Sequence, residues 1–277
     1  MYSLDKEGTM QGMTLLETLQ TSDMVTQYMW GFSPDNPQFV GILVAALIAF
    51  LIGYIEQFLS IVMIRKEKHG SFSLPMNTFY LAHDFLTGVV FLYLGFYNHF
   101  FWIFMILGIG MFIWNFTEII DMYDYCYHNR EETFRGIFFG ELTPKKCIME
   151  CIAQTIGFVV FILLMIVLMD DPTFIKWFMI TNIVIAVCTG YYWSKNKVVW
   201  GTSKILAIVI LVGTINTFLP VGLGWWTTLY PNVFDTPLFY LMGAVSVCFA
   251  LRNVYIVFKK LPAKPKVHPE TGKKTIL

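Results

Sequence analysis

The chain has 277 residues, of which 56% are hydrophobic and only 14% are charged, and its formal net charge is zero. Because a soluble domain averages about 25% charged residues, this composition indicates a polytopic membrane protein, and we expect one domain. The balanced charge gives no signature of nucleic-acid binding. Five cysteines, an odd number without a CxxC pair, argue against a disulfide framework, and we expect them to serve in packing.

Residues 1–38 form an outer N-terminal segment that is too polar to cross a bilayer. Between Met10 and Trp30, apolar residues recur at roughly helical spacing, which predicts either an interfacial amphipathic helix or a poorly ordered tail. Lys6 is the only basic residue of this segment, and no compact apolar run with a small-residue cleavage site follows it, so we expect no cleavable signal. The cluster SPDNP at 33–37 predicts a turn that ends the segment.

Seven apolar segments follow, each near the ~20 residues that a membrane-spanning helix needs. They predict an all-α integral membrane protein, a seven-transmembrane-helix bundle over residues 39–259. The second and third segments are nearly continuous, and Tyr97-Asn98-His99 is the only break between them. The predicted helices cover residues 39–64, 74–97, 98–121, 147–169, 174–193, 198–219 and 236–259.

The lysines and arginines of the short loops set the expected orientation. Basic residues follow the first, third, fifth and seventh segments, whereas the opposite side carries only Lys6 and Lys176. Because such loops stay cytoplasmic, we expect the N-terminus outside and the C-terminus in the cytoplasm, in the plasma membrane or the endoplasmic reticulum. The basic residues on the cytoplasmic side are Arg65, Lys66, Lys68, Arg130, Arg135, Lys145, Lys146, Lys195, Lys197, Lys259, Lys260, Lys264, Lys266, Lys273 and Lys274.

Three segments outside the helices have expected roles. Residues 122–146 are predicted to form a polar cytoplasmic loop, and residues 220–235 an outer loop in which Trp225 and Trp226 anchor at the membrane interface. Residues 260–277 form a basic cytoplasmic tail, which we expect to be mobile and to touch anionic lipid headgroups.

Polar residues within the predicted spans gather in the halves nearest the cytoplasm. Asp84 lies about 15 Å from the inner end of the second helix, at 1.5 Å per residue. An ionisable side chain at that depth costs about 2.5–3.5 kcal/mol on insertion scales, so it normally faces a protein interior or a wet cavity. We therefore predict a pocket that opens toward the cytoplasm and contains Asp84. The other polar residues are Glu56, Asn115, Glu118, Asp121, Glu150, Gln154, Lys204, Arg252 and Asn253.

On the second helix, Asn77, Tyr80 and Asp84 follow the spacing i, i+3, i+7 and share one face. His83 lies about 100° from Asp84 around the helix, so both side chains are not expected to point straight into one pocket. We favour His83 as a hydrogen-bonding residue between helices, with a substrate contact as the alternative.

Arg252 cannot give up its proton, so at its predicted depth it needs an anionic partner. Glu56 and Asp84 are the two candidates. Such pairs are either structural ion pairs of the bundle or parts of a catalytic or binding site. Lys204, nearer the end of its helix, can extend its amino group toward the membrane surface.

Acids recur every three residues in Asn115-Phe-Thr-Glu118-Ile-Ile-Asp121-Met-Tyr-Asp124. This spacing loosely resembles the Asp-rich Mg²⁺ sites of membrane prenyltransferases. No second acidic motif faces it, so we expect acids of the cytoplasmic edge without a metal ion. Cys126 and His128 are too small a set for a zinc site. We expect no cofactor.

Two short stretches resemble a known family. Residues 64–75, IRKEKHGSFSLP, end one helix and open another with an acid nine residues on, and Trp200-Gly-Thr-Ser-Lys204 begins the sixth helix. Both resemble the membrane-bound meroterpenoid terpene cyclases of the paxilline and pyripyropene pathways. The resemblance implies a seven-helix protein without a metal requirement, in which intramembrane acids protonate an epoxide or alkene and start cyclisation of an isoprenoid chain.

Asp84 falls where that family has its helix-2 glutamate. The family's second acid, in the last helix, aligns with Arg252 here, and His83 replaces an aromatic residue before the helix-2 acid. A carboxylic acid in an apolar pocket can stay protonated at neutral pH and act as a general acid. Aromatic faces can stabilise a developing carbocation.

Two hypotheses follow. In the first, the protein is an acid-initiated cyclase or isomerase of a lipid-like, isoprenoid substrate, with Asp84 as proton donor. In the second, it is a small-molecule transporter or binding protein with an Asp84–Arg252 pair as its gate. The distance between these two residues separates the hypotheses. The candidate catalytic residues are Asp84, Glu56 and Glu118, and the candidate substrate-binding residues are Asn77, Tyr80, His83, Asn115, Lys204 and Arg252.

Overall fold

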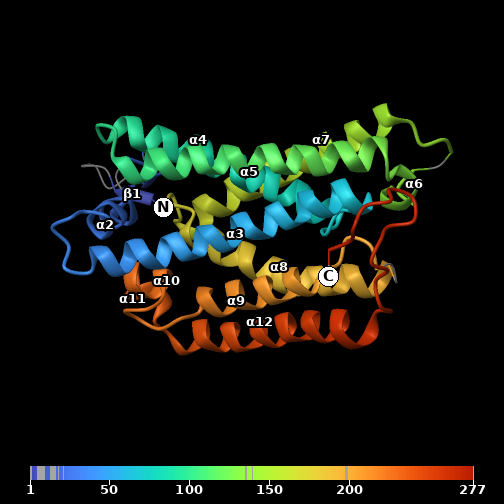
Figure 1. Ribbon diagram of the computed structural model, residues 1–277. Coiled ribbons are helices and arrows are strands. Elements are labelled where there is room, and N and C mark those ends of the chain that lie inside the picture. The colour runs from blue at the N-terminus through green and yellow to red at the C-terminus, as the bar shows by residue number, and fades with distance from the viewer. Residues whose placement is uncertain are drawn as a thin grey trace.

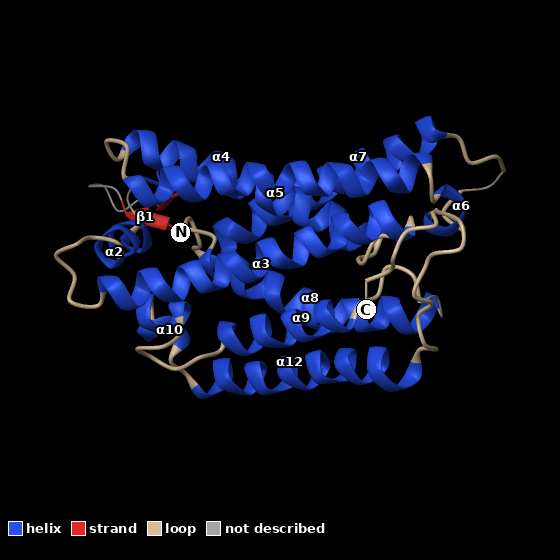
Figure 2. Ribbon diagram, in the orientation of Figure 1, coloured by secondary structure: helices blue, strands red, loops and turns tan. Residues whose placement is uncertain are grey.

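Helices dominate the computed structural model, which describes residues 2–4, 10–12, 17, 19–20, 22–134, 136–138, 140–196 and 199–276 (Figures 1 and 2). Two short strands near the N-terminus, β1 Tyr2–Leu4 and β2 Met10–Gly12, pair antiparallel. The bundle consists of α3 Phe39–Glu67, α4 Leu74–Tyr97, α5 Trp102–Tyr127, α7 Pro144–Met169, α8 Ile175–Asn196, α9 Lys204–Thr217 and α12 Pro237–Tyr255, which continues as the π-helical turn η1 Ile256–Lys260. The short helices at its ends are α2 Asp23–Gly31, α6 Arg130–Thr133, α10 Trp225–Leu229 and α11 Pro231–Phe234.

Six helices of the described chain are long and apolar enough to cross a membrane: α3, α4, α5, α7, α8 and α12 with η1. The chain is therefore a polytopic helical membrane protein, as its composition predicts. The exception in the bundle is α9, which is apolar but has 14 residues. At 1.5 Å per residue it reaches only ~21 Å, against a hydrocarbon core of about 30 Å. A seventh crossing stays a prediction.

The shortness of α9 has a local cause. Its predicted start, residue 198, lies outside the described residues, and the helix begins only at Lys204. Ser203 caps it, because its hydroxyl oxygen accepts the backbone N–H groups of Ile205 and Leu206 at 3.1 and 3.3 Å. Just before the cap, Gly201 has a φ of +71°, a left-handed conformation that favours glycine and does not continue a helix.

The predicted break between the second and third helices is confirmed. α4 ends at Tyr97, and the amide of Asn98 donates to the carbonyl of Leu94 at 2.8 Å. His99 and Phe100 then adopt positive φ values of 54° and 61°, which reverse the chain before α5 begins. At its other end α5 continues through 122–127, which we predicted to be loop, so every acid of the Asn115–Asp124 stretch lies on one helix.

The N-terminal segment packs on the bundle at one end. Tyr28 of α2 is fully buried and stacks on Phe104 of α5, with the ring centroids 5.2 Å apart. The predictions for this segment partly depended on residues that lie outside the described ones: Lys6, Met13 and Leu16. The loop residues Arg135 and Lys197 also lie outside them. An interfacial position for this segment stays a prediction.

At the opposite end, the C-terminal tail folds back over the helix ends (Figure 1), and its mobility stays a prediction. Val267 and Lys274 form an isolated β-bridge, and the hydroxyl of Thr271 donates to the carbonyl of Lys66 at 2.6 Å. The amino group of Lys264 lies 2.8 Å from both carboxylate oxygens of Glu67, which is fully buried. This ion pair anchors the tail, which a basic composition alone did not predict. We call this end, with α6 and the tail, the C-terminal end of the bundle.

Candidate functional site

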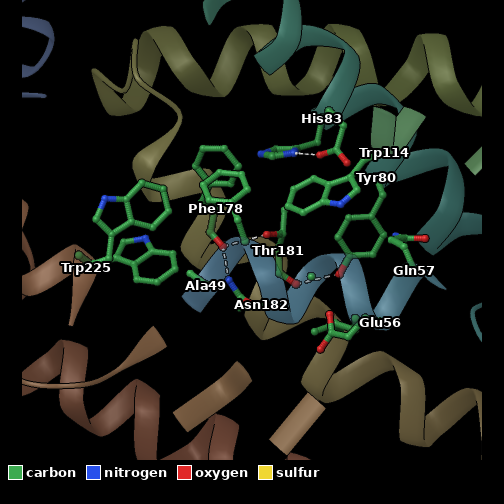
Figure 3. Close-up of a pocket in the computed structure, with 15 residues that line it drawn as sticks. Ala49, Glu56, Gln57, Tyr80, His83, Trp114, Phe178, Thr181, Asn182 and Trp225 are labelled. Carbon is green, nitrogen blue, oxygen red and sulfur yellow. Dashed lines mark hydrogen bonds and ion pairs between the residues drawn. The ribbon is translucent and has the colours of Figure 1, made fainter. Parts of the chain in front are cut away.

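A cavity of about 70 Å³ lies in the bundle between α3, α4, α5, α8 and α10 (Figure 3). Its wall combines two carboxyl groups and an imidazole with six aromatic side chains. It is lined by Ala49, Phe50, Gly53, Glu56, Gln57, Tyr80, His83, Asp84, Trp114, Phe178, Thr181, Asn182, Ile185, Trp225 and Trp226. This volume holds a few water molecules, so a larger ligand has to displace side chains or extend beyond the cavity.

His83, at the top of the close-up in Figure 3, contacts Asp84. The imidazole Nδ1 lies 2.6 Å from Asp84 Oδ1, and the two residues are 1% and 4% exposed. The expectation that His83 points elsewhere is wrong, because side chains that leave a helix about 100° apart can still bend toward each other. His83 Nε2 has no hydrogen-bond partner in the described part of the chain. The imidazole is therefore fixed at one nitrogen and free at the other.

Glu118 and Asn115 lie behind Asp84, away from the cavity surface. The carboxyl group of Glu118 lies close enough to that of Asp84 for the two to interact electrostatically, and the amide of Asn115 donates to Glu118 Oε2 at 3.2 Å. No Lys or Arg side chain lines the cavity within the described residues, and the basic side chain in contact with Asp84 is that of His83.

The row of polar groups continues from Glu118 toward the C-terminal end. Asp121 Oδ2 accepts hydrogen bonds from the hydroxyl of Ser60 at 3.1 Å and the amide of Asn77 at 3.3 Å. The same Asn77 amide donates to the hydroxyl of Tyr125 at 2.9 Å. Asn77, which shares a helix face with Asp84 in sequence, therefore belongs to this row and does not line the cavity. Each of Asn77, Glu118 and Asp121 has one buried side-chain oxygen without a partner among the described residues.

Tyr80 and Glu56 line the cavity as predicted from their positions. The Tyr80 hydroxyl donates to the backbone carbonyl of Thr181 at 2.8 Å, which joins α4 to α8. Glu56 is buried on α3, and Figure 3 shows it on the side of the cavity away from His83. The two acids Asp84 and Glu56 therefore approach the cavity from different helices and different sides.

The predicted partnership of Arg252 with Glu56 or Asp84 is not formed. Arg252 is exposed, lines a separate hollow at the C-terminal end and makes no ion pair within the described residues. The next residue, Asn253, faces the bundle instead, and its amide donates to the carbonyl of Ala186 at 2.7 Å. Adjacent positions point about 100° apart, so an inward Asn253 turns Arg252 outward. The Asp84–Arg252 pair that the transporter hypothesis named is therefore not formed in this structure, and the hypothesis itself stays a prediction.

Lys204 also lies outside the cavity. It is exposed at the start of α9, with its amino group 5.2 Å from the ring centroid of Phe258. It lines another hollow, beneath the C-terminal tail.

The aromatic wall is the part of the site that sequence reasoning missed. Trp225 and Trp226, predicted as interfacial anchors, are each 1% exposed, because α10 folds back into the bundle. The indole N–H of Trp226 donates to the carbonyl of Ile175 at 2.8 Å, which fixes α10 against α8. Trp114 and Phe178 complete the wall. Among 26 Phe and 8 Trp residues, no sequence signal distinguishes those that face one cavity.

The described residues contain no group of three His, Cys, Asp or Glu side chains arranged to hold a metal ion. All five cysteines are free thiols, and three of them, Cys126, Cys147 and Cys151, pack in a small core at the C-terminal end.

Comparison of the chain with protein-family models, curated proteins and solved structures finds no match. The fold and the site define a polytopic helical membrane protein with a buried cavity that combines carboxyl groups and aromatic rings. Its function has to be inferred from that chemistry.

Proposed function

We propose that the cavity is an active site in which a buried carboxylic acid starts the cyclisation or isomerisation of an isoprenoid, lipid-like substrate. The observation that carries this proposal is the position of Asp84. Its carboxyl group lies in a cavity with six aromatic side chains and close to a second carboxyl group, that of Glu118, and no Lys or Arg side chain lines the described cavity wall. The Arg252 side chain, which would neutralise the acid, is exposed elsewhere.

The proposed reaction begins when Asp84 transfers its proton to an epoxide oxygen or an alkene carbon of the substrate. With an epoxide, the new O–H bond forms as a C–O bond breaks and leaves positive charge on carbon. A neighbouring double bond attacks that carbon and closes a ring. Loss of a proton from the final cation completes an isomerisation that needs no oxidant or reductant.

The other cavity residues have defined parts in this proposal. The rings of Trp114, Phe178 and Trp225 present π faces that stabilise the carbocation. Glu56, on the opposite side of the cavity from His83, accepts the proton that the final cation loses. Glu118, close to Asp84, returns a proton to it and takes one from water, and Glu56 releases its proton to water, so that each carboxyl group ends the cycle as it began. His83 holds the Asp84 carboxyl group in place.

The proposed orientation places the C-terminal end of the bundle in the cytoplasm. Described basic side chains concentrate at that end. Lys176, between α7 and α8 at the other end, directs its amino group to the carbonyls of Met169 and Asp170 at 2.5 and 3.2 Å.

The test compares wild type with Asp84→Asn in membranes that receive a linear epoxidised isoprenoid. We expect wild type to form a product of unchanged mass and altered retention, and Asp84→Asn to leave the precursor unconverted. Glu150→Gln, the same kind of change on α7 outside the cavity, is the matched control and should retain activity. Equal membrane insertion of all three proteins is confirmed first. Full conversion by Asp84→Asn would overturn the role of Asp84, and movement of the compound without isomerisation would favour transport.

A further inference from the structure

A second and larger hollow, of about 890 Å³, runs along the bundle between α7 and α8, with α4 behind it. One face of α8, with Ile180, Val184 and Cys188, lines it from one side, and Phe161 and Met165 of α7 line it from the other. These side chains follow a spacing of three or four residues, so each helix presents one apolar face to the hollow. We call it the α7–α8 groove.

The α7–α8 groove and the cavity lie on two sides of the same stretches of α4 and α8. Phe79 and Trp177 line the groove, while their sequence neighbours Tyr80 and Phe178 line the cavity. The rings of Phe79 and Trp177 lie 6.1 Å apart, and the ring of Phe79 lies 6.4 Å from the imidazole of His83. A chain that reaches Phe79 in the groove therefore lies one ring away from His83, which contacts the candidate proton donor Asp84.

The end of the groove nearest the C-terminal end of the bundle is polar. Lys195 and Tyr191, both exposed, lie there with Ser73 and Glu132. Glu132 is paired with His69 at 2.8 Å, whereas Lys195 makes no ion pair in the described chain. A cation at the mouth of an apolar groove complements an anionic head attached to an apolar chain.

We propose that the α7–α8 groove binds a membrane-borne amphiphile with one long apolar chain and an anionic, phosphate-type head. The head lies at Lys195, and the chain runs along α8 to the wall formed by Phe79 and Trp177. Binding of this ligand in the groove is one claim, and its identity as the substrate is a second claim, which rests on the proposed function. As substrate, its reacting end enters the cavity of about 70 Å³ when the rings of Phe79 and Trp177 move aside, while the groove holds the rest of the chain.

The test uses the full-length protein in phosphatidylcholine nanodiscs with two photoreactive probes. One is a long-chain alkyl phosphate with a diazirine on its chain, and the other is the corresponding alcohol. We expect cross-linked peptides from the groove-facing parts of α7 and α8. Lys195→Gln should reduce labelling by the phosphate about two- to fivefold, as for an exposed charge pair, and leave labelling by the alcohol unchanged.

Val184→Trp fills the groove with a large ring and should suppress labelling by both probes. Val160→Trp is the matched control, because Val160 lies on α7, is 61% exposed and does not line the groove. Ile180→Trp fills the groove one helical turn away from Val184. Because two variants fill the groove, a folding defect in one of them does not decide the result. Equal thermal transitions of the variants are confirmed first.

Three results would overturn the proposal: labelling spread evenly over the outer faces of the helices, labelling that survives both groove-filling variants, or equal loss of both probes in Lys195→Gln. Displacement of the phosphate probe by a two-chain anionic phospholipid at equal concentration would overturn the assignment to a single chain. These measurements do not involve turnover. If the groove is labelled as expected but Asp84→Asn still converts the isoprenoid normally, the proposed function is rejected and the groove remains a binding site.

Discussion

The ion pair between Lys264 and Glu67 should contribute strongly to the stability of the C-terminal end. Both Glu67 oxygens lie 2.8 Å from the Lys264 amino group, and the two side chains are 0% and 8% exposed, respectively. Lys264→Met keeps most of the side-chain length and removes the charge. Glu67 then retains two donors, the backbone N–H groups of Gly201 and Ile276, each at 3.0 Å.

Removal of one partner from a buried ion pair typically costs 3–5 kcal/mol, because the other charge stays buried. Since Glu67 keeps two backbone donors, we expect the lower end of this range, about 3 kcal/mol, for Lys264→Met. In the double variant with Glu67→Gln no uncompensated charge remains, so its loss of stability should be smaller than the sum of the single losses.

The assay is reversible unfolding in mixed micelles with a denaturing detergent, together with hydrogen exchange of the tail. Hydrogen exchange detects local release of the tail even when the bundle stays folded. Lys266→Met is the control, because Lys266 is an exposed tail lysine without an ion pair among the described residues, and it should change stability by less than about 0.5 kcal/mol. A loss below about 1 kcal/mol in Lys264→Met, or strict additivity in the double variant, would refute the reasoning.

Two further predictions concern a close helix contact and a pH-dependent pair. Gly190→Ala would place a Cβ against the Asn253 amide and should cost about 1–3 kcal/mol, whereas Gly157→Ala, with open space around it, should have little effect in the same unfolding assay. Equal stability of the two variants would contradict this close packing. Burial lowers the pKa of His69, but the hydrogen bonds to Glu132 and to the Glu67 carbonyl, together with the nearby charges of Glu132 and Asp124, raise it by more, so the net pKa lies above the usual 6.5. The resulting stabilisation is full below about pH 6.5 and declines as the pH rises through the folded pKa, so the melting-temperature gap between wild type and Glu132→Gln should narrow with rising pH. A constant gap would contradict this role.

The sequence by itself determined the class of protein and much of its layout. Long apolar segments with few charges cross a membrane as helices, because a helix makes the hydrogen bonds of its own backbone N–H and C=O groups. The break between two of these helices at Asn98 follows from local chain geometry. The depth of Asp84 also predicted a cavity, because a charge in hydrocarbon is costly unless it is enclosed, although the predicted opening toward the cytoplasm stays a prediction. These conclusions depend on composition and on spacing along one helix, which the sequence contains directly.

Only the tertiary structure decided which side chains meet. It brought His83 to Asp84, buried Trp225 in the cavity wall and turned Arg252 outward, although each residue type is compatible with the opposite position. It also inserted Lys264 beside Glu67, which lies 197 positions earlier in the chain. Rotation of a helix by one position and the folding of a short helix back into the bundle depend on packing between distant segments. Neither hydropathy nor helical periodicity specifies that packing, so the candidate site could be located from the sequence but not assembled.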